Sequence, residues 1–457
     1  MGRLRFLCAL WAAKLSIPAL KLTRHNGTNF PGELALKICP DFLRYIGKPA
    51  RIIAVTGTNG KTTVSNLLCD SLEQLGVRLL NNRAGSNINS GISTSLITGA
   101  DLLGRAKYDT AVFEVDERSA LRIYPYVRPE LIVMTNLFRD SIMRNGHPGF
   151  IADILTKGMP TESKLVLNAD DLICSGVAPD NARVYYGLRR MDGDLTECVN
   201  LINDMRICPK CGGRLRYEYL RYHHIGRAMC ADCGFASPEY DYAGEDVDLS
   251  AMTMTAAHGG ERCTLPLISD SVFNVYNMMA VIAALCEFGI PLAKAAEAAG
   301  KTKVVGTRHS EVHAGDIDIV MQMAKEKNAL AITRAFDYAV TKPGRKELLL
   351  MMNCLSDEKH WSENTCWLYD CDFEFLARDD VSRVIATGPR AMDYRLRLLL
   401  AGVPEEKIVC ERDELRAADM LELVPGETVY IFHGVDSFDL TVRVRERIRE
   451  RIEEAAK

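Results

Sequence analysis

The sequence predicts an α/β protein, with a doubly wound central domain, a four-cysteine ribbon inserted into it and a smaller Rossmann-like α/β domain after it. Three observations lead to this prediction. A short apolar run at residues 52–55 precedes a glycine-rich turn and an amphipathic helix. Strand-like runs then alternate with helical segments up to about residue 311, and the same alternation starts again at residue 312. Two Cys-x-x-Cys pairs interrupt the first series.

The amino-acid composition limits the classes of function that we expect for this chain. The chain has 457 residues, which is enough for two or three domains with substantial cores. Its net charge of -4 and isoelectric point near 6.2 provide no general basic field, so we expect no nucleic-acid partner. The fifteen cysteines are scattered rather than set in a secreted disulfide framework. A reducing cytoplasm is therefore the expected compartment.

The N-terminal segment, residues 1–50, is predicted to be helical and to pack on the central domain. Its basic start and apolar run are superficially those of a signal peptide, but Lys14 and Lys21 interrupt the run. The run is also too short to cross a bilayer. We expect an amphipathic helix that packs against the core, with a peripheral membrane role as the alternative.

Residues 51–63 organise the central domain. Ile52 to Val55 form a predicted buried parallel strand, and Gly-Thr-Asn-Gly-Lys-Thr-Thr then turns the chain into a helix. Glycines in such a loop let the backbone approach a polyphosphate, a lysine neutralises its charge, and a threonine hydroxyl reaches Mg²⁺. The general pattern expects glycine where Val55 stands, so the match is one residue short. The candidate ATP-binding residues are Gly57, Thr58, Asn59, Gly60, Lys61, Thr62 and Thr63.

Carboxylates follow the next predicted strand. Residues 108–115 are apolar and end in a cluster formed by Glu114, Asp116 and Glu117. A carboxylate at the carboxyl end of a neighbouring parallel strand is well placed to bind the Mg²⁺ of a nucleotide, so Glu114 is the candidate ligand. A solvated carboxylate at a strand end is the alternative. Further strands are predicted at residues 130–135 and 164–167.

The cysteine pairs have metal-site spacing. Cys208-x-x-Cys211 and Cys230-x-x-Cys233 are each followed by glycine and are separated by about eighteen residues. This spacing predicts one closed structural zinc site with four thiolates, and a redox Cys-x-x-Cys is the alternative. The basic and aromatic tract at 214–227 is predicted to be the β-hairpin between the pairs rather than a nucleic-acid surface.

The motifs resemble those of the Mur ligases and folylpolyglutamate synthases, which form amide bonds through acyl phosphates. The segments that start at Glu114 (Glu-Val-Asp-Glu), Thr135 (Thr-Asn-Leu-Phe-Arg-Asp) and Leu167 (Leu-Asn-Ala-Asp-Asp) are similar to those of the MurT family, the ligase subunits of lipid II isoglutaminyl synthase. A zinc ribbon in the central domain also matches that family. Because only about fifty residues precede the loop, we expect no nucleotide-sugar domain of the kind that other Mur ligases carry.

The resemblance implies further site residues and the cofactors ATP, Mg²⁺ and structural Zn²⁺. Glu114 matches the Mg²⁺-facing glutamate, and Asn277 in Phe-Asn-Val-Tyr-Asn matches an asparagine on the adenine side of ATP. Arg308 matches a phosphate-binding arginine, although Thr307 is inserted before it. A surface arginine before a domain linker is the alternative for Arg308.

The resemblance also implies a partner, a GatD-like glutamine amidotransferase. Members of the family supply an aspartate that completes a Cys-His-Asp triad with the cysteine and histidine of GatD, and Asn364 aligns with that aspartate. An asparagine can orient the partner's imidazole but brings no charge. Glu363 or Asp357 could serve instead, or the segment no longer touches a glutaminase.

The implied function is ATP-dependent activation of the α-carboxyl of D-glutamate in lipid II, followed by amidation to D-isoglutamine with ammonia from the glutaminase. The protein would then be cytoplasmic and peripheral to the membrane through its lipid-linked substrate. Another amide-bond ligase and a non-catalytic nucleotide-gated zinc protein are the alternatives. The expected domains are the N-terminal segment, the ATP-binding domain with its ribbon, and a MurT-type domain, at residues 1–50, 51–311 (ribbon about 205–236) and 312–457.

Overall fold

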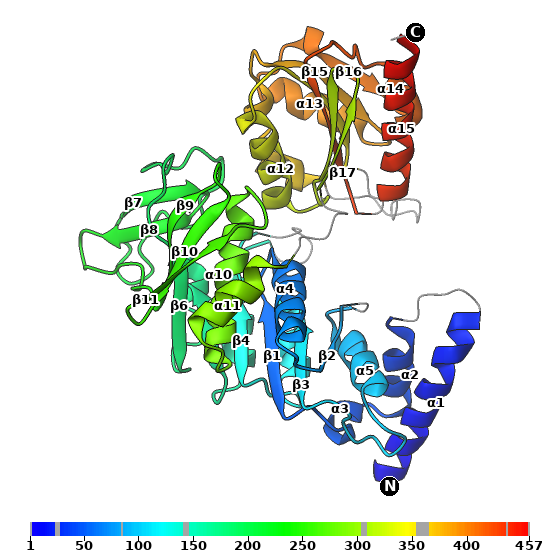
Figure 1. Cartoon of the computed structure of the whole chain (residues 1–457), viewed down its shortest axis with the longest axis vertical. Coiled ribbons are helices and arrows are strands. Elements are labelled where there is room, and N and C mark those ends of the chain that lie inside the picture. The colour runs from blue at the N-terminus through cyan, green and yellow to red at the C-terminus, as the bar shows by residue number, and fades with distance from the viewer. Residues whose placement is uncertain are drawn as a thin grey trace. The chain divides into compact units, whose positions relative to one another are not determined.

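The computed structural model describes residues 2–22, 28–83, 86–139, 146–302, 309–352, 365–435 and 437–455 (Figure 1). The chain forms two compact units. The first consists of Met1–Phe138, Pro148–Val199 and Asn203–Val304, and the second of Arg139–His147, Asn200–Ile202 and Val305–Lys457. Each unit is built around one large mixed sheet with helices, which confirms the predicted α/β class.

A nine-stranded sheet forms the centre of the first unit, in the order β11-β10-β9-β6-β5-β4-β1-β3-β2. Pairing is parallel from β2 through to β9, whereas β10 and β11 extend the sheet antiparallel. The strands are β1 (Arg51–Thr56), β2 (Leu79–Asn81), β3 (Thr110–Glu114), β4 (Leu131–Met134), β5 (Lys164–Asn168), β6 (Arg183–Leu188), β9 (Tyr242–Asp248), β10 (Thr253–His258) and β11 (Glu261–Pro266).

The central strands are apolar because both faces of this part of the sheet are covered. In β1 every residue after Arg51 is buried, and all four residues of β4 are buried. The longer covering helices are α4 (Lys61–Gln74), α5 (Asn89–Thr98), α8 (Pro148–Gly158), α10 (Val272–Glu287) and α11 (Leu292–Gly300). The N-terminal segment adds α1 (Gly2–Leu22), α2 (Phe30–Ile38) and α3 (Phe42–Tyr45).

The cysteine-rich insertion forms a separate antiparallel pair, β7 (Leu215–Tyr222) and β8 (Ile225–Cys230). This pair is the hairpin that the sequence predicts. Six buried residues make a small core beneath it, namely Leu172, Met205, Cys208, Leu215, Ala228 and Cys230. Two of the six are cysteines of the predicted metal site, so this core depends on the cysteine cluster.

The second unit contains a six-stranded sheet in the order β12-β13-β17-β14-β15-β16. Only the pairing of β12 with β13 is antiparallel. The strands are β12 (His309–Ala314), β13 (Ile317–Met323), β14 (Lys346–Met351), β15 (Val381–Thr387), β16 (Ile408–Glu411) and β17 (Thr428–His433). The helices are α12 (Ala329–Thr341), α13 (Ala391–Leu400), α14 (Glu414–Asp419) and α15 (Phe438–Ala455).

Alternating residues of β17 belong to two different cores, one on each face of this sheet. Tyr430 and Phe432 lie in one core, and Val429 and Ile431 lie in the other. Residues of α15 at a spacing of four close the second core, with Val444, Ile448 and Ile452 turned inward. The arginines and glutamates between them form the solvated face that the sequence predicts. Among the described residues, no helix is long and apolar enough to cross a membrane.

Candidate nucleotide site and four-cysteine cluster

The glycine-rich loop follows β1 and leads into α4 with the geometry of an anion-binding turn. Gly57 has φ +118° and Gly60 has φ +85°, values that side-chain-bearing residues rarely adopt. A methyl group at Gly57 would lie 2.3 Å from Thr135 Oγ1, and one at Gly60 would lie 2.5 Å from Asn277 Oδ1. Both positions therefore require glycine. Asn277, the predicted adenine-side residue, lies beside the loop.

Asn136, at the end of β4, holds the loop from the neighbouring strand. Its carbonyl oxygen accepts from Thr58 N at 2.8 Å, and its side-chain Oδ1 accepts from Asn59 N at 3.0 Å. Its Nδ2 donates back to Asn59 O at 3.0 Å. These contacts fix the loop through the backbone atoms of Thr58 and Asn59. The sequence places Asn136 at a strand end but does not reveal this role.

Lys61 lies in the first turn of α4 and is held at the loop. Its Nζ lies 2.8 Å from Glu117 Oε1 and donates to the carbonyl oxygens of Gly57 and Thr58. The side chains of Lys61 and Glu117 are only 13% and 2% exposed. Burial raises the pKa of the Glu117 carboxyl, and the adjacent Lys61 ammonium opposes that shift. A buried carboxylate thus holds the ammonium group next to the anion-binding turn.

The sequence indicates Glu117 only as a member of an acidic cluster and does not predict its contact with Lys61. It belongs to the predicted acidic cluster, but the chain turns from β3 into a short 3-10 helix, η1 (Glu117–Ser119). Strand alternation therefore no longer tells which carboxylate faces the loop. The sequence did contain one signal for this role: Glu117 is a further carboxylate three residues after Glu114, the predicted magnesium ligand.

Glu114, the predicted Mg²⁺ ligand, ends β3 directly beside β1. The two strands are parallel, with Glu114 in register with Val55 just before the loop. Asn87 Nδ2 donates to Glu114 Oε1 at 2.8 Å, and Asn82 bonds both backbone polar groups of Glu114 at 2.9 Å. Carboxylate and hydroxyl oxygens are ligands that Mg²⁺ accepts, so Glu114 and the half-buried Thr62 suit this ion.

Several predicted site residues cannot be placed. Arg308, Asn364, Glu363 and Asp357 all lie outside the described residues. Their predicted roles therefore stay predictions.

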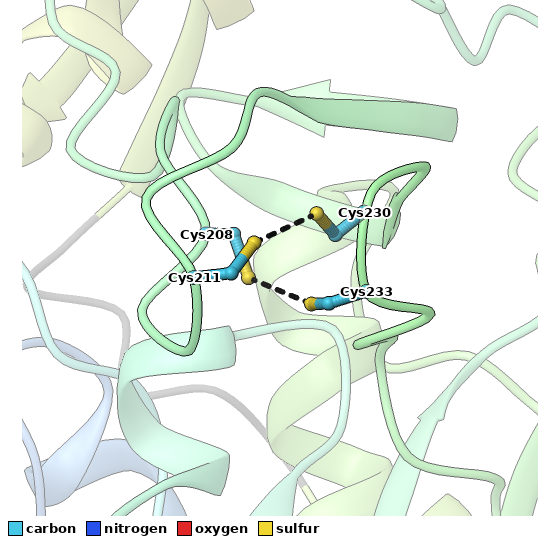
Figure 2. Close-up of side chains that lie close together, drawn as sticks. All are labelled: Cys208, Cys211, Cys230 and Cys233. Atoms are coloured by element: carbon cyan, nitrogen blue, oxygen red, sulfur yellow. Dashed lines mark hydrogen bonds between the residues drawn. The ribbon is translucent and has the colours of Figure 1, made fainter.

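The four predicted cysteines lie together. Cys208 Sγ is 3.6 Å from Cys233 Sγ, and Cys211 Sγ is 3.5 Å from Cys230 Sγ. All four sulfurs are within 4.8 Å of one another, and Figure 2 shows the two pairs pointing toward each other from facing turns. A tetrahedral zinc with Zn–S bonds of about 2.3 Å needs sulfurs about 3.8 Å apart. The cluster can therefore hold one tetrahedral metal ion.

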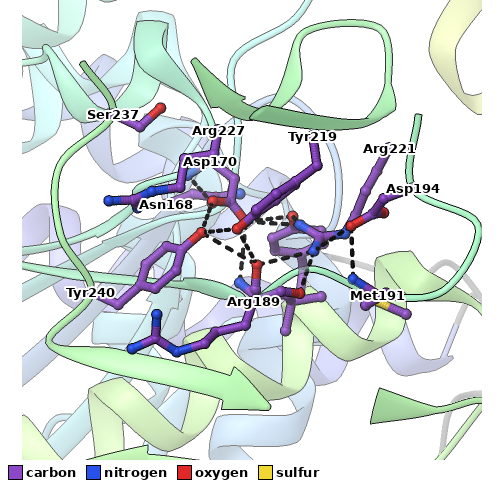
Figure 3. A network of polar contacts seen from close by, with 12 residues as sticks. Asn168, Asp170, Arg189, Met191, Asp194, Tyr219, Arg221, Arg227, Ser237 and Tyr240 are labelled. Atoms are coloured by element: carbon purple, nitrogen blue, oxygen red, sulfur yellow. Dashed lines mark hydrogen bonds and ion pairs between the residues drawn. The ribbon is translucent and has the colours of Figure 1, made fainter. Parts of the chain in front are cut away.

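A buried ionic network joins the β7–β8 hairpin to the sheet below it (Figure 3). Arg221 of β7 lies 3.1 Å from Asp170, which follows β5, and 3.1 Å from Asp194. Tyr276 of α10 donates to Asp170 at 2.6 Å, and Tyr240 donates to the same carboxylate. The Arg221 and Asp170 side chains are 3% and 0% exposed. Desolvation disfavours the Arg221 charge, but the surrounding groups outweigh it and raise the pKa of Arg221.

The turn of the hairpin makes a second connection. The His224 ring packs on Phe138 with the ring centroids 4.4 Å apart, and its Nε2 lies 3.3 Å from Asp171 Oδ1 without hydrogen-bond geometry. The other oxygen of Asp171 accepts from the backbone N–H of Leu137 at 2.7 Å, one residue beyond Asn136. Arg221 in turn contacts Tyr276, the neighbour of Asn277. The hairpin therefore packs close to the neighbours of Asn136 and Asn277, the two residues that flank the glycine-rich loop.

We infer from these contacts that Arg221 positions residues around the candidate nucleotide site. Strand alternation in the sequence could not have indicated this role, because β7 has irregularities between Tyr217 and Tyr219 and between Leu220 and Tyr222. We expect Arg221→Gln to weaken ATP binding about ten-fold. It should also lower stability, because breaking a buried pair costs about 3–5 kcal/mol. Nucleotide titration and thermal melts measure the two effects.

Tyr276→Phe separates positioning from folding, because it removes one hydroxyl and keeps the ring. It should raise the KM for ATP with a smaller change in melting temperature and no change in the KM for ammonium. Arg216→Gln, at an exposed position of the same strand, is the matched control. Unchanged ATP affinity in both Arg221→Gln and Tyr276→Phe would contradict the positioning role.

Solved structures share the fold. A pseudomurein peptide ligase type C from Methanothermus fervidus superposes with a TM-score of 0.66 at 21% identity, covering 90% of this chain and 81% of that chain. MurF from Acinetobacter baumannii superposes with a TM-score of 0.63 at 14% identity, covering 91% of this chain and 80% of that chain. At these identities the similarity establishes the Mur-ligase-like α/β fold alone.

Sequence comparisons are more specific. The Mur ligase middle domain family matches residues 55–190, and the MurT ligase C-terminal family matches residues 326–435. The lipid II isoglutaminyl synthase (glutamine-hydrolyzing) subunit MurT of Staphylococcus aureus (strain COL) is 30% identical over 93% of this chain and 94% of its own length. The protein of the same name from Streptococcus pneumoniae is 29% identical over 84% of each chain. The chain therefore belongs to the MurT family of Mur ligases.

Proposed function

We propose that this chain is the ATP-dependent ligase subunit of a lipid II isoglutaminyl synthase. It would activate the α-carboxyl of the D-glutamyl residue of lipid II as an acyl phosphate and amidate it to D-isoglutamine. The observation that carries this proposal is the similarity to MurT over nearly the whole chain, together with a phosphate loop in which Lys61 is buried next to the turn. The reaction belongs to peptidoglycan synthesis.

The roles of the loop residues follow from charge. Transfer of the γ-phosphoryl group of ATP to a carboxylate brings two anions together, so the site must supply positive charge and backbone donors. Lys61 and the N-terminal N–H groups of α4 provide both. Thr62 and Glu114 would hold Mg²⁺, which would neutralise phosphate charge. Arg308 would stabilise the transferring phosphoryl group, and Asn277 would contact the adenine side of ATP.

Ammonia then attacks the carbonyl carbon of the acyl phosphate, and phosphate leaves with the oxygen that came from the carboxylate. The acyl phosphate must be kept from water until ammonia arrives, because water would hydrolyse it back to the carboxylate. We infer a doubly wound phosphate-loop domain at residues 51–311 and a Rossmann-like MurT-type domain at 312–457. The enzyme would act in the cytoplasm on a lipid-linked acceptor.

We infer that the four-cysteine cluster holds a structural Zn²⁺. Four thiolates leave no open position for a substrate, which is typical of a structural rather than a catalytic zinc. The S···S distances of 3.5 and 3.6 Å support this inference, as does the small core that includes two of the cysteines.

The proposed function is tested with purified protein, ATP, Mg²⁺ and lipid II, with either ammonium or free amino acids as the amine. Mass spectrometry should find a product about 1 Da lighter than lipid II with ammonium, because an amide NH₂ replaces a carboxyl OH. Addition of an amino acid instead would assign the chain to the peptide-adding ligases. Nucleotide binding without any product from either amine would indicate a non-catalytic protein.

The partner would be a GatD-like glutamine amidotransferase, and Asn364 would orient its catalytic imidazole. Asn364→Ala should then lower glutamine-dependent amidation about ten-fold or more and leave ammonium-dependent amidation unchanged. Asn364→Asp should be tolerated or faster, since a carboxylate also stabilises the imidazolium. Parallel assays with the two nitrogen donors measure this difference. An unchanged glutamine-driven rate in Asn364→Ala would contradict the role.

A further inference from the structure

Helix α1 has two apolar faces, and only one of them packs against the protein. Phe6, Ala9, Leu10 and Ala13 are buried in the core of the first unit. Figure 1 shows α1 beside α2, on which it packs, and α1 also contacts α5. The packing of this helix on the first unit confirms part of the prediction, but the helix is not amphipathic, because its other face is apolar too.

The second face, which we call the outer face, consists of Leu4, Trp11, Leu15 and Leu22. Their exposed fractions are 71%, 44%, 73% and 86%. Spacings of seven and four residues place all four side chains along one line of the helix. Such a stripe, apolar and exposed over the length of a helix, marks an interaction surface rather than scattered surface leucines.

The loop next to Trp11 extends this surface. Trp11 Nε1 donates to Leu102 O at 2.8 Å, and the side chains of Leu102 and Leu103 are 68% and 54% exposed. Asp101 is turned away into its own loop, where its carboxylate accepts from the backbone N–H groups of Leu103 and Arg105 at 2.8 Å. One oxygen of this half-buried carboxylate is therefore engaged within the loop.

The charged residues of helix α1 all have one sign. Residues 2–22 include four basic residues, Arg3, Arg5, Lys14 and Lys21, and no aspartate or glutamate. Arg3 and Arg5 are exposed on α1, and Arg105 and Lys107 are exposed on the adjoining loop. Arg5 Nε also donates to the carbonyl oxygen of Ile38, and Lys14 donates to the carbonyl oxygens of Ile97 and Ala100, so both cations are anchored to the protein as well. An exposed apolar stripe thus lies between exposed cations.

We propose that the outer face of α1 docks on an anionic phospholipid surface, with the helix lying in the plane of the membrane interface. Leucine and tryptophan side chains would enter the boundary between headgroups and acyl chains, and the flanking arginines would meet lipid phosphates. A second copy of the chain fits less well. Two outer faces packed together would bring like charges into contact without an acidic partner on either helix.

The surface fits the proposed function, because an enzyme that amidates lipid II must reach a headgroup at the membrane. The link to lipid II rests on that proposed function, whereas the exposed stripe and its charges are features of the structure itself. The test therefore uses vesicles without lipid II and without ATP. Its outcome is independent of whether the chain is an amide ligase.

The experiment is co-sedimentation of the purified full chain with vesicles of phosphatidylglycerol and phosphatidylcholine, and with vesicles of phosphatidylcholine alone. Wild type should bind the anionic vesicles and lose binding at high salt. Leu4→Glu/Leu15→Glu should bind about ten-fold more weakly or less. Leu396→Glu/Leu400→Glu, which makes the same change at two exposed leucines of α13, should bind like wild type. The blue shift of tryptophan fluorescence on binding should shrink in Trp11→Phe.

Two results would overturn the proposal. The first is that wild type does not bind anionic vesicles, or that Leu4→Glu/Leu15→Glu binds them as strongly as wild type does. The other is a dimer, seen by light scattering, that Leu4→Glu/Leu15→Glu dissociates, which would assign the outer face to a second copy. The double variant should still amidate a soluble, lipid-free acceptor at the wild-type rate, because neither leucine belongs to the nucleotide site.

Discussion

Lys61→Ala is expected to reduce ATP-dependent amidation by on the order of 10³-fold or more, because the loop then loses its one cationic side chain. The loss should appear in kcat with ammonium as well as with glutamine, since both routes need the acyl phosphate. Steady-state ADP release coupled to product detection measures it. The glycine backbone and the N-terminus of α4 remain, so some nucleotide binding should survive.

The Lys61→Ala variant also leaves Glu117 buried without its partner, which is expected to destabilise the first unit. Lys61→Met/Glu117→Gln removes both charges and should recover much of the melting temperature without recovering activity. Lys301→Ala, which breaks an exposed pair with Glu297, is the control for loss of a lysine. Wild-type turnover in Lys61→Ala would refute the assignment of the loop.

Cys208→Ser and Cys230→Ser are each expected to abolish metal binding. Wild type should contain about one zinc per chain, because four thiolates converge on one site. Zinc binding at such sites contributes about 10–16 kcal/mol of apparent free energy, which stabilises the fold around it. The hairpin should therefore unfold, and proteolysis should cut it in the variants but not in wild type. Elemental analysis and limited proteolysis measure the two effects.

Loss of the metal should also weaken ATP binding, because Arg221 and His224 of the hairpin support the residues around the phosphate loop. Cys263→Ser, at a half-buried cysteine of β11, is the matched control and should keep both zinc and ATP affinity. Protein purified without chelators that contains no zinc would refute the site. Full ATP affinity in a zinc-free variant would refute the coupling alone.

The sequence allowed prediction of features set by short stretches of chain. The apolar run of β1 and the positive-φ glycines of the loop are local features of the sequence. The spacing of the cysteines alone predicted that the four thiols lie together. The family resemblance pointed to Glu114 and Asn277, which the structure places at the end of β3 and beside Gly60, while their roles stay predictions. In each case a few neighbouring residues determine the local backbone, so no tertiary information was needed.

Contacts between distant segments could not be predicted in this way. The pairs Lys61–Glu117 and Arg221–Asp170 are separated by 56 and 51 residues, and only the order of strands in the sheet brings them together. The antiparallel extension by β10 and β11 was missed because these strands are partly exposed and mix polar with apolar residues. For α1 the sequence indicated one apolar face, and the fold was needed to show that the second is uncovered.

An isotope-transfer measurement tests most directly whether this site activates a carboxylate as an acyl phosphate. Lipid II labelled with ¹⁸O in the α-carboxylate of its D-glutamyl residue is incubated with the protein, ATP, Mg²⁺ and ammonium, and the released phosphate is analysed by mass spectrometry. Carboxylate activation should place one ¹⁸O in the phosphate for each amide formed, and Lys61→Ala should release no labelled phosphate. Amide formation with unlabelled phosphate would contradict it.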